Sequence, residues 1–425
     1  MHVQRQRIAI VGSGISGLTA AYFLNKQHEV VLYEANAYLG GHTNTVDINV
    51  DGKALAVDTG FLVFNDLTYP NLIAFFNELG VASYESDMSF GVSINGGALE
   101  WAGTNLDTVF AQRKNLLSFS FLSMLRDILR FNRSAQHYLH LAENTNWTLH
   151  DLLKNENYGE AFSGNYLVPM AAAIWSSSPQ DILQFPAQTF LRFCLNHALL
   201  QVNNRPKWRT VQGGAREYVK KIAATLPDIR LNAPVLSVLR SGAKVTLKTK
   251  DSTECFDHVI LATHAPDTIR ILSDITEEEK QLLAAARYQA NEAYLHTDEK
   301  LLPKNKKVWS AWNYLSGESI DNKQPVCVSY LLNQLQKLDT NKAVIVTLNP
   351  TMKPAAEHIL AKFSYDHPIF DQSAIDSQKN IASIQGIKKT WFAGAWTGYG
   401  FHEDGLKSAL RVLKQFNAAP AWTAI

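Results

Sequence analysis

The sequence IAIVGSGISG at residues 8–17 decides how the N-terminal part of this chain folds. An apolar strand runs into three spaced glycines, a helical stretch LTAAYFLNK follows, and a second apolar strand, VVLY, comes next. Gly12 permits the tight turn after the strand, Gly14 lets the backbone approach a pyrophosphate, and Gly17 lets the helix pack closely on the sheet. This order of strand, glycine turn, helix and strand predicts a dinucleotide-binding βαβ unit.

The polar contacts of this unit come from the start of the helix and the end of the second strand. The helix N-terminus, which includes Ser16, presents unpaired N–H groups and the positive end of its dipole to a phosphate. Glu34 follows the first glycine by about twenty residues, the spacing at which a carboxylate reaches a ribose 2′-hydroxyl. A 2′-phosphate would be repelled at that position.

The composition narrows the class of protein. The 425 residues predict two lobes with a large core, and the net charge of +1 argues against nucleic-acid binding as the main task. Cys194, Cys255 and Cys327 are scattered without metal-ligand spacing, so we expect reduced thiols and no metal site. The opening MHVQRQR is too short for a signal peptide, which predicts a cytoplasmic protein.

Strand and helix patterns alternate along the chain, which predicts an α/β fold. We expect a helix over 70–80, a hairpin over 88–101 that turns at Asn95-Gly96, and a mainly helical region over 106–197 with breaks at Gly159, Gly164 and Pro179. Further strand patterns are found at 229–236, 243–248, 258–262, 292–295, 308–313, 326–332 and 343–348.

The parallel strands of this pattern come from three separated stretches. We therefore predict a nucleotide domain formed by 1–80, 205–275 and 385–425, interrupted by a substrate domain formed by 81–204 and 276–384.

A basic, Leu- and Phe-rich segment covers residues 113–141. No run of eighteen apolar residues appears in the chain, so this segment does not span a bilayer. Two interpretations stay open: a basic amphipathic helix that lies on a membrane surface, or a helical lobe whose apolar face packs on the protein. The second is the more common arrangement.

A second glycine pair follows the predicted βαβ unit. The sequence EANAYLGGHTNT places Gly40 and Gly41 beside the nucleotide, and a long extended cofactor such as FAD uses such a pair where its ribityl arm passes the protein. The opening GSGISG, Glu34 and this pair resemble the flavin amine oxidase superfamily. The segments LGGHTNT, VDTGFLVFN, PMAAAIWS and GAWTGYGFHEDGLKS resemble its bacterial subfamily of predicted FAD/NAD-binding oxidoreductases.

The resemblance covers essentially the whole chain and implies a Rossmann-type FAD-binding domain (GR2-like) interrupted by a mixed α+β substrate domain. Residues 209–219 are similar to the PxGG segment of the family, and 391–410 to its closing motif, in which a new helix points its N-terminus at the flavin. Besides the glycines, Ser16 and Glu34 named above, the resemblance implies cofactor contacts at Ala35, Gly40, Gly41, His42, Thr43, Val235, Ala262, Gly394, Glu403, Asp404, Gly405 and Leu406. No cysteine lies in the closing motif, which implies non-covalent FAD.

The chain also departs from the better-known amine oxidases. His42 replaces the arginine of their GGR sequence, and Asn291 or Glu292 aligns with the lysine that many of them hold near flavin N5. These departures weaken the expectation of amine oxidation. The resemblance to the bacterial subfamily also implies a link to the modification of membrane fatty acids.

The closing motif supplies the candidate catalytic residues His402, Trp396 and Tyr399. His402 is expected to act as a general acid or base with a pKa near neutrality, or else, with Glu403, to cap the following helix. Trp396 and Tyr399 are expected to form walls of the substrate cavity. Further wall candidates are Ile174, Trp175, Ser176, Asn196, His197, His296, Trp312, Asn313 and Tyr314.

The leading hypothesis is an FAD-dependent oxidoreductase that accepts a hydride from a small hydrophobic substrate, such as an acyl chain, and forms a double bond as a desaturase does. The flavin would be reoxidised by O₂ or another acceptor. Two alternatives stay open: an amine oxidase, and a non-redox protein or isomerase that uses FAD structurally.

Overall fold

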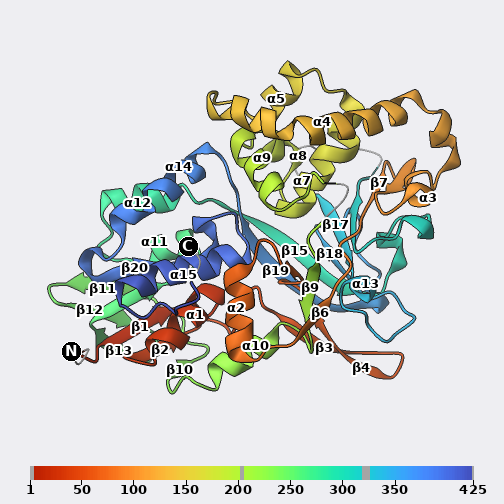
Figure 1. The fold of residues 1–425 in the computed structure, drawn as a ribbon. Helices are drawn as coiled ribbons and strands as arrows, with labels where there is room; N and C mark the ends of the chain where they lie inside the picture. Colours follow the sequence, from red (N-terminus) through yellow and green to blue (C-terminus); the bar gives the residue numbers. More distant parts are fainter. Residues whose placement is uncertain (1–3, 202–204, 318–325, 424–425) are drawn as a thin grey trace.

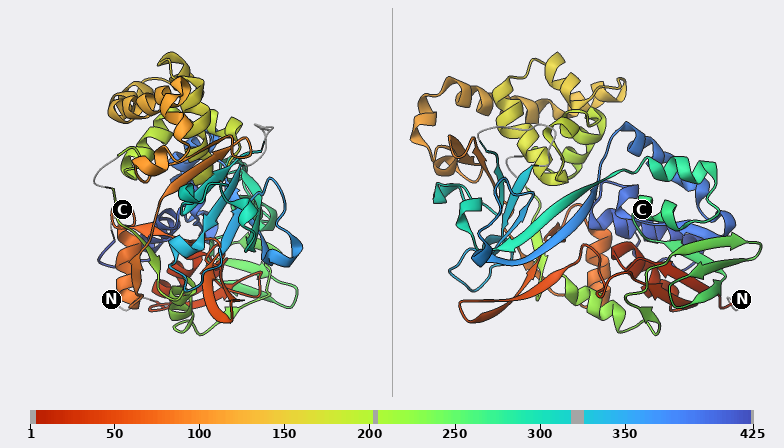
Figure 2. Two further views of the ribbon diagram at one scale, coloured as in Figure 1. Left: turned by 90° about the vertical axis from the view of Figure 1, so that its right-hand side faces the viewer. Right: turned by 180° about the vertical axis from the view of Figure 1, so that it is seen from behind.

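The computed structural model describes residues 4–201, 205–317 and 326–423. Two large sheets form the two halves of the molecule, and a group of helices lies over the larger sheet (Figure 1). Two long antiparallel strands run between the halves, as the right-hand view of Figure 2 shows. These strands are β15 (Tyr288–His296) and β19 (Ile359–Pro368).

The smaller of the two large sheets has five strands, all parallel. In spatial order they are β10 (Ile229–Arg230), β2 (Glu29–Tyr33), β1 (Arg7–Val11), β14 (His258–Leu261) and β20 (Thr390–Phe392). The prediction that parallel strands come from three separated stretches of chain is confirmed. The boundaries of the two domains stay predictions.

Two helices pack side by side on this sheet: α1 (Ile15–Leu24) and α15 (His402–Gln415) (Figure 1). Their close approach depends on glycines. A Cβ on Gly17 would lie 1.9 Å from the carbonyl oxygen of Gly12, and one on Gly405 would lie 2.7 Å from the side chain of Ile15. The expected role of Gly17 in close helix packing is therefore confirmed.

The larger sheet has seven strands and carries the other half of the molecule. In order they are β19, β15, β18 (Ile345–Leu348), β17 (Cys327–Leu331), β16 (Trp312–Leu315), β7 (Phe90–Ile94) and β8 (Leu99–Ala102). The hairpin predicted to turn at Asn95-Gly96 is confirmed, with φ of 50° and 60° at these residues. The strand predicted at 308–313 begins later, and the sequence analysis missed β19.

The region 106–197 is helical, as predicted. Its elements are α3 (Leu106–Val109), η1 (Arg113–Leu117), α4 (Phe119–Glu143), α5 (Leu149–Asn155), α6 (Glu160–Phe162), η2 (Ser163–Leu167), α7 (Val168–Trp175), α8 (Pro179–Leu183) and α9 (Ala187–Asn196). The expected break at Gly164 is wrong, because the chain continues there as one turn of π-helix. Breaks do occur before Glu160 and at Pro179.

The remaining elements connect these parts. In the first of three small sheets, β3 (Thr45–Val50) pairs with β4 (Lys53–Asp58). In the second, β9 (Trp208–Val211) lies between β5 (Phe64–Asn65) and β6 (Ser83–Glu85). In the third, β12 (Lys244–Lys248) lies between β11 (Ser237–Ser241) and β13 (Thr253–Phe256). The other α-helices are α2 (Pro70–Leu79), α10 (Arg216–Ala223), α11 (Ala265–Ile271), α12 (Glu277–Ala284), α13 (Leu332–Leu335) and α14 (Gln372–Asn380). Within the described ranges, no helix combines the length and apolarity needed to cross a bilayer.

Candidate active site

A single cavity of about 590 Å³ joins the glycine-rich end of the five-stranded sheet to an aromatic chamber beneath the helices. Its walls come from the βαβ unit, from the turn after β14, from the closing motif and from the larger sheet. Fourteen of the predicted site residues line it: Gly12, Gly14, Ser16, Glu34, Ala35, Gly40, Gly41, His42, Val235, Ala262, Gly394, Trp396, Tyr399 and His402.

The glycine turns keep one end of the cavity free of side chains. Gly12 has φ of +100°, which favours glycine, and a Cβ on Gly14 would meet no atom within 4 Å. Gly41 lies against Gly14, because a Cβ there would be 3.3 Å from the Gly14 Cα atom. A phosphate can therefore approach this backbone closely, as the fingerprint requires.

Glu34 lies at the end of β2 with its side chain buried and held in place. Ser13 donates its backbone N–H (3.0 Å) and its hydroxyl (2.5 Å) to Oε2, and Asn36 donates its backbone N–H to Oε1 (2.8 Å). The carboxylate is thus fixed beside the glycine turn before any ligand binds. This arrangement fits the ribose-binding role expected for an acidic residue at this position.

His402 begins α15 and lies in a closely packed setting. Its ring stacks on Phe61 with centroids 3.6 Å apart, and its Nε2 atom lies 2.9 Å from the Thr43 hydroxyl and 3.4 Å from the Tyr218 hydroxyl. Burial lowers the pKa of His402 to about 3. The expected pKa near neutrality is therefore wrong, and His402 is uncharged at neutral pH.

The two carboxylates that follow His402 act as helix caps. Glu403 accepts the backbone N–H groups of Asn71 (3.1 Å) and Leu72 (2.9 Å), so it caps α2 rather than its own helix. Asp404 accepts the backbone N–H of Phe401 (3.1 Å) and closes a capping box at the start of α15.

Six predicted cofactor residues lie outside the cavity wall: Gly17, Thr43, Glu403, Asp404, Gly405 and Leu406. Each has a structural contact instead. Gly17 and Gly405 permit close helix packing, Thr43 holds His402, and the two carboxylates cap helices. Leu406 is fully buried in the core beneath the sheet. These residues support the residues of the wall.

Trp396 and Tyr399 both line the cavity, as expected of wall residues. Trp396 is 4% exposed, and its indole packs so closely on Gly394 that a Cβ there would lie 2.4 Å from Nε1. Tyr399 lies 5.5 Å from Phe193, centroid to centroid. Of the further wall candidates, Ile174, Trp175, Ser176, His197 and Trp312 line the cavity, whereas Asn196, His296, Asn313 and Tyr314 do not.

Sequence reasoning missed several wall residues that come from β19 and from the turn after β14. Tyr365 donates to or accepts from the Thr59 hydroxyl (2.7 Å), and its ring lies 5.2 Å from that of His42. The ring centroid of His367 lies 5.5 Å from that of His42, and the ring centroid of His264 lies 6.0 Å from that of His42. The strict alternation of polar and apolar residues over 361–366 is the signal that would have identified β19.

The residues aligned with the flavin N5 lysine do not reach the cavity. Asn291 is buried between strands, where its amide donates to the carbonyl oxygens of Gln289 and Tyr365. Glu292 is exposed and forms an ion pair with Lys362 (2.6 Å).

Several histidines lie on the cavity wall, and all of them are uncharged at neutral pH. Five line the cavity: His42, His197, His264, His367 and His402. Burial lowers the pKa of each ring, to about 4 for His197 and His367 and well below its usual range for His42. These imidazoles are therefore uncharged at neutral pH.

Comparison with known proteins places this geometry in a family. A sequence profile of flavin-containing amine oxidoreductases matches residues 15–412. No curated protein matches the chain in sequence.

Solved structures share its fold. A CLA-producing fatty acid isomerase from P. acnes superposes with a TM-score of 0.69 at 15% identity, covering 97% of this chain and 98% of the other. Putrescine oxidase bound to putrescine gives 0.66 at 16% identity, covering 97% and 99%. Cyclohexylamine oxidase from Brevibacterium oxydans gives 0.65 at 15% identity, covering 97% and 100%. The chain belongs to the flavin-containing amine oxidoreductase family and is a flavin-dependent oxidoreductase, with FAD as the cofactor of such families.

Proposed function

We propose that this enzyme removes a hydride from an uncharged hydrophobic substrate, an esterified acyl chain, and leaves a double bond in it. When bound, FAD accepts the hydride and passes the electrons to O₂ or another acceptor. In this proposal, the Rossmann-type FAD-binding domain comprises residues 1–80, 205–275 and 385–425. The substrate domain comprises residues 81–204 and 276–384.

The absence of an unpaired cation among the described residues of the cavity wall carries the proposal. Among the described residues that line the cavity there is no lysine, and the one arginine is Arg270, which is paired with Asp267. A free carboxylate would be buried there without a cation, which is strongly unfavourable.

The substrate chamber is large and mostly apolar. Phe193, Leu199, Trp208, Trp312, Tyr330, Leu348 and Phe370 contribute to its walls. Such side chains bind a hydrocarbon chain by contact area and exclude water from it. Desaturation also releases a proton, and the neutral rings of His42, His264 and His367 can accept it, since burial keeps them unprotonated.

Two alternatives have support of their own. The aromatic walls also suit a neutral amine, and two of the similar folds are amine oxidases. An isomerase that returns its electrons is favoured by the similarity to the fatty acid isomerase fold.

Anaerobic bleaching of the flavin absorbance tests the three functions. The purified holoenzyme is mixed separately with a neutral acyl ester, with the matching free fatty acid and with each of a set of amines. The masses of the products are measured by mass spectrometry. We expect bleaching with the ester and a product with two hydrogens fewer. Bleaching by amines alone identifies an amine oxidase, and a product of unchanged mass without lasting bleaching identifies an isomerase. A colourless protein that takes up no FAD contradicts all three.

A further inference from the structure

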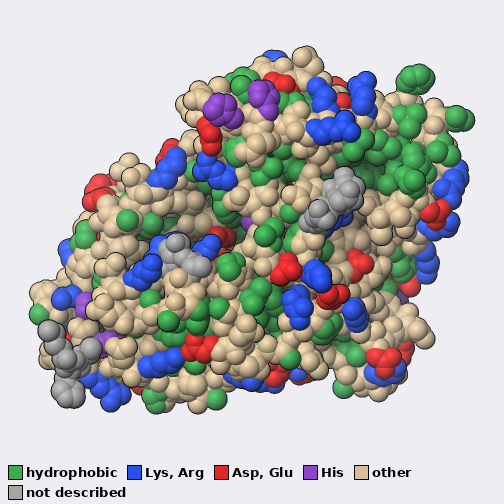
Figure 3. All heavy atoms as spheres, viewed as in Figure 1, with side chains coloured by type: hydrophobic (Ala, Val, Ile, Leu, Met, Phe, Trp, Pro, Cys, Tyr) green, Lys and Arg blue, Asp and Glu red, His purple; other side chains and the backbone are tan. Residues whose placement is uncertain are grey.

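An exposed apolar surface lies at the start of the helical region. The three most exposed large hydrophobic side chains of the described chain are Phe119 (93%), Leu117 (89%) and Leu106 (77%). Two neighbours are also exposed, and together these five residues form what we call the apolar tip: Leu106, Leu116, Leu117, Phe119 and Leu122. Figure 3 shows hydrophobic side chains gathered at the upper right, where Figure 1 draws α3 and the segment leading into α4.

The apolar tip is separate from the apolar stripe that holds α4 in the protein. Phe121, Met124, Phe131, Ala135 and Tyr138 are buried on the inner face of α4, which packs against α9. The packed-lobe interpretation of 113–141 is thus confirmed for the inner face. The tip residues belong to the chain before α4 and to its outer face, and they do not contribute to that core.

Basic side chains continue from the tip along the outer face of α4. Four exposed residues follow one another there at helical spacing: Leu122, Arg126, Leu129 and Arg133. Arg113 and Lys114 are exposed beside the tip. Long basic side chains of this kind keep their charge at the headgroup level while their stems contact apolar surface.

Acidic residues are few on this surface. Between 106 and 133 the chain has five basic residues and two acidic ones, Asp107 and Asp127. Asp107 is paired with Arg113 and Lys307, and the buried Asp127 is shared between Arg126 (3.6 Å) and Arg130 (3.4 Å). The uncompensated charge of the outer face is therefore positive.

We propose that the apolar tip inserts into the surface of an anionic phospholipid bilayer, with the arginines of the outer face of α4 at the headgroups. The two features match the two requirements for peripheral binding: apolar side chains for the acyl boundary, and positive charge for anionic lipid. This inference concerns where the protein docks and does not depend on the substrate or the reaction proposed above.

Vesicle co-sedimentation of the FAD-loaded protein tests the proposal without turnover. Wild-type protein is mixed with vesicles of phosphatidylcholine alone or of phosphatidylcholine with about one third phosphatidylglycerol, at low and high salt. We expect binding to the anionic vesicles that weakens as salt rises. Leu117→Ser with Phe119→Ser is expected to lower the partition coefficient at least tenfold, and Arg126→Gln with Arg133→Gln to remove most of the salt dependence.

The matched control replaces exposed leucines elsewhere: Leu236→Ser with Leu239→Ser, at 54% and 45% exposure. It is expected to bind vesicles as wild type does. Flavin absorbance confirms that every variant is folded, and light scattering gives its mass. The proposal is overturned if wild type does not sediment with anionic vesicles, if the control loses binding equally, or if the tip variant only converts a dimer to a monomer.

Discussion

Glu34 is the residue at which cofactor retention can be separated from folding. Its carboxylate is already fixed by Ser13 and Asn36, so a bound ribose meets an acceptor that needs no rearrangement. We expect Glu34→Gln to weaken FAD binding about 10- to 100-fold, the loss of one hydrogen bond to a charged group, or about 1.5–3 kcal/mol. Titration of apoprotein with FAD measures it. Glu29→Gln, on the exposed end of the same strand, is the control, and equal affinities for both variants would contradict the role.

His402 tests whether a buried neutral imidazole contributes to turnover. We expect His402→Ala to slow flavin reduction by substrate at least tenfold while FAD stays bound, because the ring that fills the space between Phe61 and Thr43 is lost. Anaerobic stopped-flow absorbance measures the rate. With a pKa of about 3, His402 does not titrate between pH 5 and 9, so wild type should show no step from this residue. Thr43→Val, which removes its hydrogen bond, should give a smaller decrease; a wild-type rate in His402→Ala would exclude the role.

Residues fixed by local backbone geometry could be predicted from the sequence. Gly12 and Gly17 have steric reasons that act within one βαβ unit, and the spacing to Glu34 follows from the length of that unit. His264 and His367 could not be predicted as cavity residues, because only the tertiary fold brings them beside His42. The lowered pKa of His402 could not be predicted from the sequence either, because it depends on how deeply the ring is buried in the fold.

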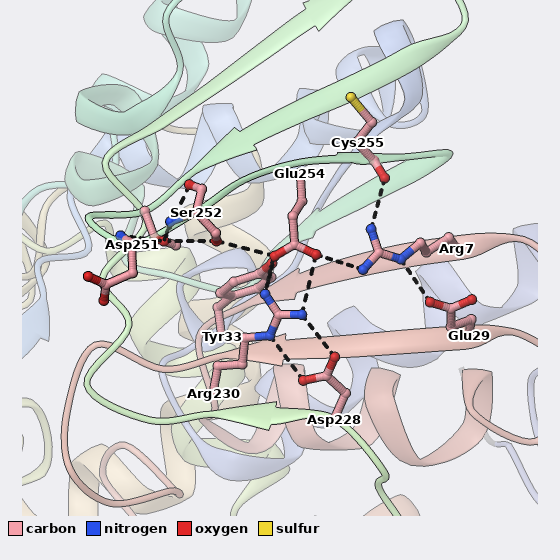
Figure 4. A network of polar contacts seen from close by, with 10 residues as sticks. Arg7, Glu29, Tyr33, Asp228, Arg230, Asp251, Ser252, Glu254 and Cys255 are labelled. Carbon is pink, nitrogen blue, oxygen red and sulfur yellow. Dashed lines mark hydrogen bonds and ion pairs between the residues drawn. The ribbon is translucent and has the colours of Figure 1, made fainter.

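At the scale of elements, a charge cluster fastens β13 to strands β1 and β10 of the parallel sheet (Figure 4). Glu254 on β13 accepts hydrogen bonds from Arg7 of β1 (2.7 Å) and from Arg230 of β10, and these arginines lower the pKa of Glu254 to about 2. The side chain of Glu254 is 21% exposed, so solvent screens the pair only in part.

We expect Glu254→Gln to lower the free energy of unfolding by about 1–2 kcal/mol, because two charge-assisted contacts become neutral. The depressed pKa means that the stabilisation is present above pH 4.5 and is lost as the pH falls towards 2. Urea unfolding at pH 7 and pH 3 measures the difference between wild type and variant. Glu85→Gln, which removes only the long Lys207 contact at 3.9 Å, is the control. A difference that is as large at pH 3 as at pH 7 would rule out this explanation.

The predicted elements succeeded where one local signal was strong. The helix ending at Gly80 and the Asn95-Gly96 hairpin both have residues with positive φ at the turn. Gly164 was a false signal, because its helix is stabilised by packing around Phe162 and Leu167 despite the glycine. The strand at 359–368 was missed although polar and apolar residues alternate over 361–366, so the local signal was present and was overlooked.

At the scale of the whole molecule, the cavity is assembled from segments more than 300 residues apart. His402 meets Thr43 across 359 positions, and Ser16 donates to the carbonyl oxygen of Gly405 across 389. The sequence predicted that the first glycine turn and the closing helix meet, because each resembles a known part of one site. That the described wall of the chamber between them holds no unpaired cation follows only from the folded structure.

The burial that keeps several histidines uncharged makes the stability of the protein depend on pH. Burial lowers the pKa of His197, His296 and His367 to about 4 and that of His402 to about 3. Below pH 6.5 the unfolded chain binds protons on these rings that the folded chain does not bind. Each such proton lowers the free energy of unfolding by about 1.4 kcal/mol per pH unit as the pH falls.

Two buried carboxylates act in the opposite direction. Burial raises the pKa of Asp58 to about 7 and that of Asp404 to about 6, so the folded chain retains protons there that the unfolded chain releases above pH 3.8. Their contribution to stability therefore grows as the pH falls from 7 to 4.

The four histidines outnumber the two carboxylates, so we expect stability to be greatest between pH 6 and 7 and to fall between pH 6 and 4. Urea unfolding from pH 8 to pH 4.5 measures the curve. His296→Asn, which removes one titrating ring outside the cavity, should make the acidic decrease shallower by about one proton. A stability that stays level or increases from pH 6.5 to pH 5 would show that these histidines are not buried in their neutral form.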